Sequence, residues 1–214
     1  MENVKFALYL LVALVPSLVL HEFAHAAAAD RLGDPSPRRW GRLTLSPRRL
    51  FDPFGSIVLP ALILILVAAG RGLLPIFAYA KPVPLDPTYL RNPERDSLIV
   101  VLAGLGANLA IAAVAGIVLR LGIPGEAGTF AYAWLVVNVY MFVFQLMPVP
   151  GLDGAKLLAR VLPPRPRQVY VNLDQYLPLF ILVIFFLLAG PLLSIVRALA
   201  GTVCTILTGS DICP

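Results

Sequence analysis

The only two histidines of the chain stand four residues apart, with a glutamate directly after the first: His21-Glu22-Phe23-Ala24-His25. On an α-helix, side chains four residues apart share one face, so both imidazoles can bind one metal ion and Glu22 can reach a water bound to it. Zinc lowers the pKa of such a water toward neutrality, and a glutamate can accept its proton and later pass it to a leaving amine. The pattern predicts one Zn²⁺ per chain, with His21 and His25 as ligands and Glu22 as general base.

A catalytic zinc ion usually has three protein ligands and one open position. With no third histidine in the chain, the remaining ligand must be a carboxylate or a cysteine. Asp153 is the leading candidate, because the prolines and glycines around it in Met147-Pro148-Val149-Pro150-Gly151-Leu152-Asp153-Gly154 unwind a helix and can turn a carboxylate inward. A simple turn aspartate is the alternative reading of Asp153. Asp30 and Asp52 are further candidates, in segments that look loop-like or solvated.

The elements that must position these residues are mostly apolar. Of the 214 residues, 59% are hydrophobic and 14% are charged, whereas soluble domains carry roughly 25% charged residues. The net charge of +5 does not indicate a nucleic-acid partner, because the basic residues lie beside apolar spans, where positive charge sets topology. We therefore expect an all-α polytopic membrane protein, with residues 1–214 forming a single domain embedded in the lipid bilayer.

Four stretches are long enough to cross a bilayer, which takes about 20 apolar residues. A three-helix catalytic core is predicted at about 6–29, 98–119 and 127–152, and a further transmembrane helix at about 175–207. Segment 55–80 is too short for two crossings and is broken by prolines and glycines, so it is predicted to be a re-entrant hairpin, with one full crossing as the alternative. Segment 31–54, with its prolines and alternating Arg42-Leu43-Thr44-Leu45, is predicted to form a small membrane-associated β segment.

The basic residues predict the orientation of these spans. If 55–80 is re-entrant, segments 30–54, 81–97 and 149–175 lie on one side and hold 13 of the 17 basic residues. The positive-inside rule makes that side cytoplasmic. The metal site then faces the cytoplasm, and the N- and C-termini are extracytoplasmic. Cys204 and Cys213 can form a disulfide there or remain two thiols, and the sequence favours neither.

The two motifs together resemble a known family. His21-Glu22-x-x-His25 combined with Pro148-x-Pro150-x-Leu152-Asp153-Gly154 is similar to the site-2 protease family, peptidase family M50. Four intervening stretches resemble its compact bacterial branch, which has no PDZ domain: Gly41-Arg42-Leu43-Thr44-Leu45-Ser46-Pro47, Asp52-Pro53-Phe54-Gly55, Ala80-Lys81-Pro82-Val83-Pro84 and Leu90-Arg91-Asn92-Pro93. The resemblance implies a three-helix core in the inner membrane of a bacterium and a zinc site buried below the cytoplasmic surface. It also implies cleavage of a transmembrane protein or peptide substrate.

Two polar residues depart from or only partly match the family pattern. Gln145 stands where the family often has Asn, and Asn108 ends a Gly104-Leu105-Gly106-Ala107-Asn108 stretch that lacks the family's proline. The resemblance implies that both side chains position the substrate backbone or the active site. For Asn108 the alternative is helix packing, because the neighbouring glycines and alanine form a small-residue face.

Other readings of the chain remain open. Residues 5–29 also resemble a signal peptide, whose cleavage at Ala26–Ala29 would remove both histidines. Two further functions are a catalytically inactive zinc-binding scaffold, against which the intact Glu22 argues, and a membrane-bound peptidase that acts on soluble peptides. The sequence carries no signal for an oligomeric state.

Overall fold

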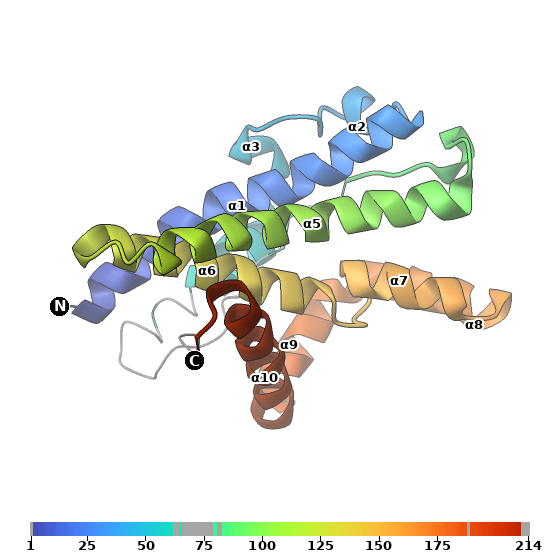
Figure 1. Cartoon of the computed structure of the whole chain (residues 1–214). Helices are drawn as coiled ribbons and strands as arrows, with labels where there is room; N and C mark the ends of the chain where they lie inside the picture. The colour runs from blue at the N-terminus through green and yellow to red at the C-terminus, as the bar shows by residue number, and fades with distance from the viewer. Residues whose placement is uncertain (1, 62–64, 66–78, 81–82, 188, 211–214) are drawn as a thin grey trace.

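The computed structural model describes residues 2–61, 65, 79–80, 83–187 and 189–210, and it is mostly helical (Figure 1). Three of its helices are long and apolar enough to cross a membrane: α1 (Glu2–Leu32), α5 (Pro93–Arg120) and α6 (Gly125–Gln145). They pack against one another as a bundle, with α5 in contact with both neighbours. The prediction of three apolar core helices is confirmed, although α1 and α5 begin several residues before their predicted limits.

The inner faces of the three helices are apolar and closely packed. Leu10, Leu14 and Leu18 of α1 are buried in the core that they share with α6, whereas Leu8 and Val12 on the same helix are exposed. Exposed apolar side chains on the outer faces are what a lipid environment requires, because lipid is as apolar as the protein interior. Helix α1 is thus an integral part of the bundle.

The connection between α5 and α6 is short. Gly122 follows the end of α5 with a φ of +69°, the left-handed conformation that commonly ends a helix and that glycine adopts without strain. The chain therefore reverses within a few residues, and α6 returns beside α5. Across the bundle, the Asn138 side chain of α6 donates a hydrogen bond of 2.8 Å to the Ser17 hydroxyl of α1.

Helix α6 ends at Gln145, seven residues before the predicted limit at 152. Pro148 and Pro150 lack the N–H groups that would continue the helical ladder, and a proline also disfavours the helical conformation of the residue before it. Residues 146–152 form a turn in which Gly151 has a φ of +91°. A new helix, α7 (Asp153–Val161), begins at the predicted ligand.

The predicted β segment in residues 31–54 is wrong. This stretch contains two helical turns, α2 (Ser36–Arg39) and α3 (Pro47–Leu50), and the described residues form no strand. Pro37 and Pro47 lie at the starts of these turns, where a missing N–H costs nothing. The backbone N–H groups of Arg42 and Leu43 both donate to the carbonyl of Pro37, so they are not available to a neighbouring strand.

The two ends of the predicted re-entrant segment 55–80 meet. After α3, the chain forms a π-helical turn, η1 (Pro53–Val58). The backbone N–H of Tyr79 donates to the carbonyl of Gly55 at 3.2 Å, and the Ser56 hydroxyl donates to the carbonyl of Tyr79 at 2.7 Å. A hairpin requires such a return, whereas one crossing would separate its ends by about 30 Å. Most of the path between them lies outside the described residues.

The C-terminal region contains α8 (Pro164–Asn172), the 3₁₀ turn η3 (Leu173–Tyr176), α9 (Leu177–Leu187) and α10 (Ala189–Thr208). The predicted helix at about 175–207 is helical on both sides of Leu188, which lies outside the described residues. Leu177 lies against Gly151, and the carbonyl of Ile206 accepts a 3.2 Å hydrogen bond from Arg120 at the far end of α5. The region therefore runs from one end of the bundle to the other. Cys204 is buried in α10, and Cys213 lies outside the described residues.

The hydrogen bond between Ser17 and Asn138 gives a test of the α1–α6 packing. We expect Ser17→Ala and Asn138→Ala each to lower stability, and the double variant to show a coupling of about 0.6 kcal/mol, the average for such bonds in membrane proteins. The measurement is unfolding of the detergent-solubilised protein in a double-mutant cycle. A coupling of zero would mean that the two side chains do not interact.

Candidate metal centre

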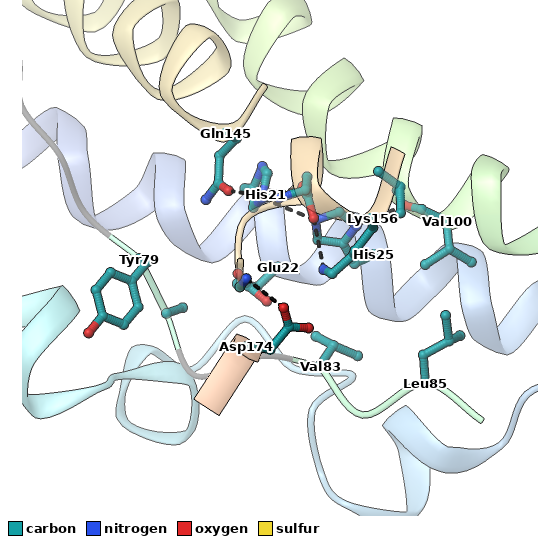
Figure 2. Close-up of a pocket in the computed structure, with 14 residues that line it drawn as sticks. His21, Glu22, His25, Tyr79, Val83, Leu85, Val100, Gln145, Lys156 and Asp174 are labelled. Atoms are coloured by element: carbon teal, nitrogen blue, oxygen red, sulfur yellow. Dashed lines mark hydrogen bonds and ion pairs between the residues drawn. The ribbon is translucent and has the colours of Figure 1, made fainter. Parts of the chain in front are cut away.

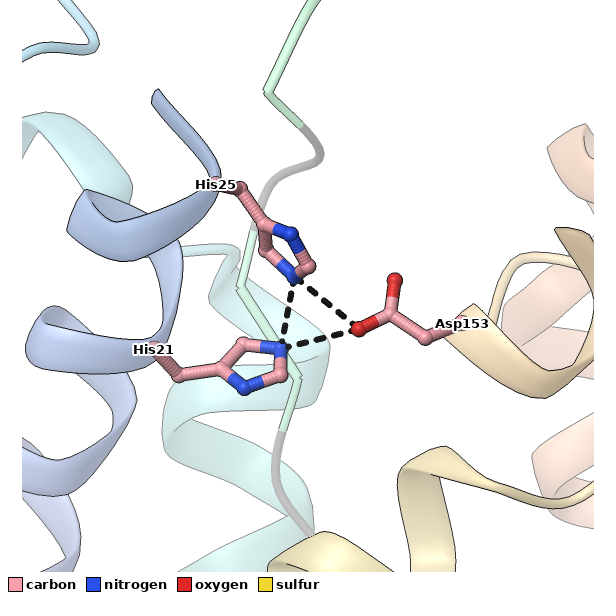
Figure 3. A group of neighbouring side chains, drawn as sticks. All are labelled: His21, His25 and Asp153. Carbon is pink, nitrogen blue, oxygen red and sulfur yellow. Dashed lines mark hydrogen bonds and ion pairs between the residues drawn. The ribbon is translucent and has the colours of Figure 1, made fainter. Parts of the chain in front are cut away.

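His21 and His25 lie on one face of α1 and point toward the same place, as their spacing predicts (Figure 3). Their Nε2 atoms are 3.0 Å apart, and the two rings are perpendicular, with centroids separated by 4.6 Å. Both side chains are almost completely buried, with exposures of 1% and 6%. Two buried imidazoles that present adjacent nitrogen atoms form half of a four-coordinate metal site.

Asp153 completes the cluster from α7. Its Oδ2 atom lies 2.9 Å from Nε2 of His25 and 3.3 Å from Nε2 of His21, so the three atoms form a small triangle (Figure 3). A tetrahedral zinc ion with bonds of about 2.0–2.1 Å separates its ligand atoms by roughly 3.3–3.4 Å, close to these distances. Oδ2 has no hydrogen-bond donor in the described structure, which leaves it available to a metal. The donor set of two imidazoles and one carboxylate fits zinc.

Helix α5 orients His25. The Nδ1 atom of this histidine lies 2.7 Å from the carbonyl oxygen of Val100. A carbonyl only accepts, so Nδ1 must carry the proton, and Nε2 then presents its lone pair toward the metal position. The ring rests on Gly104: a Cβ atom at Gly104 would lie only 2.2 Å from Nε2. Only glycine therefore fits at position 104 without displacing the His25 ring.

Asp153 is fixed by α7 and by the end of α6. Its Oδ1 atom accepts a 2.9 Å hydrogen bond from Lys156, one turn further along α7, and its backbone N–H lies 3.5 Å from the side-chain oxygen of Gln145. Burial would raise the pKa of the Asp153 carboxyl, but His25, Lys156 and His21 outweigh burial and hold that pKa well below its usual range. The ion pair with Lys156 favours the anionic form of the carboxyl, which a metal ligand requires.

The turn before Asp153 is held from the C-terminal side. Asp174 in η3 accepts a 2.8 Å hydrogen bond from the backbone N–H of Gly151. A Cβ atom at Gly154 would lie 2.1 Å from the carbonyl oxygen of Leu146, so the start of α7 packs directly on the end of α6. Burial raises the pKa of Asp174 above its ordinary value, although Gly151 and Lys156 oppose this. These contacts leave the ligand-bearing turn little freedom.

Glu22 lies beside the three ligands in a cavity of about 240 Å³ (Figure 2). The side chain is 6% exposed, and the cavity wall also contains Gln145, Lys156 and Asp174. Val83 and Leu85 cover another side of the cavity (Figure 2). The site thus combines a metal-ligand cluster, a carboxylate next to it and a small enclosed space.

The remaining sequence candidates have different surroundings. Gln145 lines the cavity, whereas Asn108 is completely buried in α5 and is not among the cavity-lining residues. Asp30 pairs with Arg38, and Asp52 caps η1 by accepting from the backbone N–H groups of Phe54 and Gly55. Neither Asp30 nor Asp52 is part of the cluster, so Asp153 is the carboxylate that the fold brings to the histidines.

Three residues of the site escaped sequence reasoning. Lys156 carried a signal, because a lysine three residues after an aspartate on a helix can pair with it. Gly104 was read only as part of a small-residue face, since the ring that needs its space lies on another helix. Asp174 gave no signal, because its bond to Gly151 depends on how the chain folds back.

Two bacterial proteins resemble this chain over most of its length. The protein named "Putative zinc metalloprotease YwhC" from Bacillus subtilis (strain 168) is 31% identical over 187 residues, which cover 83% of this chain and 80% of YwhC. "Putative zinc metalloprotease Rip2" from Mycobacterium tuberculosis (strain ATCC 25618 / H37Rv) is 37% identical over 172 residues, 79% of this chain and 63% of Rip2. The chain belongs to the site-2 protease family. The resemblance stated from its motifs is thus confirmed.

This family member is accordingly a zinc metalloprotease homologue, and three of its described helices are long and apolar enough to cross a membrane. The aligned part of this chain covers 63% of the length of Rip2 and 80% of the length of YwhC. No protein-family model matches the chain, and no solved structure matches it significantly. The roles of individual residues in this protease homologue therefore rest on the geometry described above.

The contact between Gly104 and His25 predicts the effect of one methyl group. In Gly104→Ala the new Cβ must displace the His25 ring, so we expect zinc affinity to fall at least tenfold. The matched control is Gly106→Ala on the same helix, where an added Cβ meets no atom within 4 Å. Zinc affinity is measured by competition with a chelator. Equal affinities of the two variants would show that the ring does not need this space.

Proposed function

We propose that this protein hydrolyses peptide bonds in or near the transmembrane segments of membrane-protein substrates, using one zinc ion held by His21, His25 and Asp153. The observation that carries the proposal is the depth of the cluster. At 1.5 Å per residue, His25 and His21 lie about 10 and 16 Å from the end of α1, inside a helix of membrane-spanning length. A hydrolytic centre in this position is suited to a peptide that is itself in the membrane.

Each residue has a defined task in this proposal. When bound, the zinc ion activates water and polarises the peptide carbonyl. Glu22 accepts a proton from the attacking water and delivers it to the leaving amine. Lys156 keeps the Asp153 carboxylate in place, and the side-chain oxygen of Gln145 faces the backbone N–H of Asp153. Gln145, whose side chain also lines the cavity, is proposed to hydrogen-bond the substrate backbone.

Water needs a path to a centre that is surrounded by apolar helices. A second cavity of about 310 Å³ shares Leu85, Val101, Lys156 and Asp174 with the first. Its wall also includes Glu94, Arg160 and Arg167. The shared residues put the two cavities side by side, and the charged lining of the second makes it a suitable entrance for water.

The proposed location is the plasma membrane of a bacterium, with the site toward the cytoplasm and both termini outside. The relatives are bacterial, and the positive-inside rule places the basic segments around the site in the cytoplasm. The far end of the bundle bears an ion pair between Lys5 and Glu126, and α10 ends there beside Arg120. Both ends of the described chain therefore lie away from the metal site, as this orientation requires.

The first test of the proposal is the metal content and activity of the detergent-purified protein. We expect about one equivalent of zinc in the wild type and in Glu22→Gln, and none in Asp153→Ala, because Asp153 is a ligand and Glu22 is not. Glu22→Gln should lower the rate of peptide cleavage by a factor of about 10²–10⁴, the usual contribution of a general base. Reconstituted transmembrane peptides and soluble peptides are compared as substrates.

Three outcomes would contradict parts of this proposal. Zinc retained by Asp153→Ala would mean that the third ligand is wrong. Zinc bound without cleavage of any peptide by the wild type would favour a non-catalytic scaffold. Equal cleavage of soluble and membrane-embedded peptides would favour a membrane-bound peptidase without selectivity for transmembrane segments.

A further inference from the structure

Asn108 is a completely buried polar residue. Its side chain on α5 has no exposed surface, and neither its oxygen nor its nitrogen has a hydrogen-bond partner among the described residues. Buried amides are normally hydrogen-bonded, so an unpaired one calls for an explanation. Asn138 on α6 is buried to the same extent, but its nitrogen donates to the Ser17 hydroxyl and to the carbonyl of Trp134.

His21 also has a buried polar atom without a hydrogen-bond partner in the described part of the chain. Its Nδ1 atom is buried and has no partner in the described structure, whereas Nδ1 of His25 is held by the carbonyl of Val100. Metal-binding histidines almost always donate their second N–H to an acceptor, which fixes the ring and its tautomer. One of the two proposed histidine ligands has this support, and the other lacks it.

The register of α1 and α5 brings these groups to the same level. The helices run in opposite directions, as the colours along α1 and α5 show (Figure 1). Gly104 lies against His25. On α1, His21 lies four residues before His25, which is about 6 Å along the helix axis. On α5, Asn108 lies four residues after Gly104, which is the same distance in the same spatial direction, because the two helices are antiparallel. Asn108 is therefore level with His21.

We infer that Asn108 is a positioning residue for the metal site: its side-chain oxygen accepts the Nδ1 proton of His21 when zinc is bound. Helix α5 then orients both imidazoles, His25 through the carbonyl of Val100 and His21 through the amide of Asn108. The side-chain oxygen of Gln145 lies nearby but faces the backbone N–H of Asp153. This inference rests on the proposed metal site, and it replaces the substrate-positioning role that the family resemblance suggests for Asn108.

The test is zinc affinity of the full chain in detergent, measured by chelator competition without substrate. We expect Asn108→Ala to lower the affinity 10–100-fold, the usual effect of removing such a partner. Asn108→Asp keeps an acceptor of the same size and should stay within a few-fold of the wild type. The matched control is Asn138→Ala, which removes an equally buried asparagine and should lower thermal stability without changing zinc affinity.

Failure of the inference can be told apart from failure of the proposed function. A wild-type protein that binds no zinc contradicts the proposed function itself. If the wild type binds zinc and Asn108→Ala binds it equally well, only the inference is overturned. A raised KM for a peptide substrate in that variant would then assign Asn108 to substrate binding.

A spectroscopic measurement covers the case in which Asn108→Ala does not fold. Because the chain has two histidines, zinc-loaded protein labelled with ¹⁵N-histidine gives two Nδ1 signals. The signal of His25 is identified by ¹³C-labelling of the valine carbonyls, because its Nδ1 atom lies 2.7 Å from the carbonyl oxygen of Val100. We expect Asn108→Asp to move the signal of His21 and to leave that of His25 in place. A spectrum in which neither signal moves, or in which only the His25 signal moves, overturns the inference.

Discussion

The close approach of α1 and α5 is the contact on which the metal site depends. Small residues commonly let membrane helices approach each other, and the gain is usually backbone packing. Here the space above Gly104 is occupied by the imidazole of His25, and the carbonyl of Val100 one turn earlier holds the same ring. A larger residue at position 104 would separate the helices or turn the ring. In either case the Nε2 atoms of His21 and His25 would no longer lie side by side.

The third ligand reaches the site by a different route. A carboxylate within an apolar helix is costly to bury, and Asp153 instead stands at the first position of α7, outside the three spans. There the N-terminal end of the helix favours a negative charge, and Lys156 neutralises the oxygen that faces away from the histidines. The unwound turn after Gln145 thus lets a polar helix place its first residue inside the bundle.

Local patterns predicted much of this site, and tertiary contacts explain the rest. The spacing of His21 and His25 determines their common face, because helical geometry is local, and Glu22 follows the first of them directly. Asp153 followed from the lack of a third histidine and from the prolines before it. Gly104 and Asp174 matter only because distant segments meet there. The β segment was wrong for a related reason: alternation in Arg42–Leu45 is typical of strands, but a strand needs a partner, and these N–H groups bond to Pro37 instead.

The arrangement divides the ligands between two parts of the molecule. Helix α1 supplies both histidines, and α5 holds His25 through a hydrogen bond that needs no metal. Asp153 comes from the turn after α6, which is fixed by Asp174 and packs on Leu177. A zinc ion that binds all three ligands therefore cross-links the two parts, and it stabilises their association in proportion to its binding free energy. Because the hydrogen bond between His25 and Val100 exists without zinc, loss of the metal should loosen the turn that carries Asp153 before it disturbs the packing of α1 on α5.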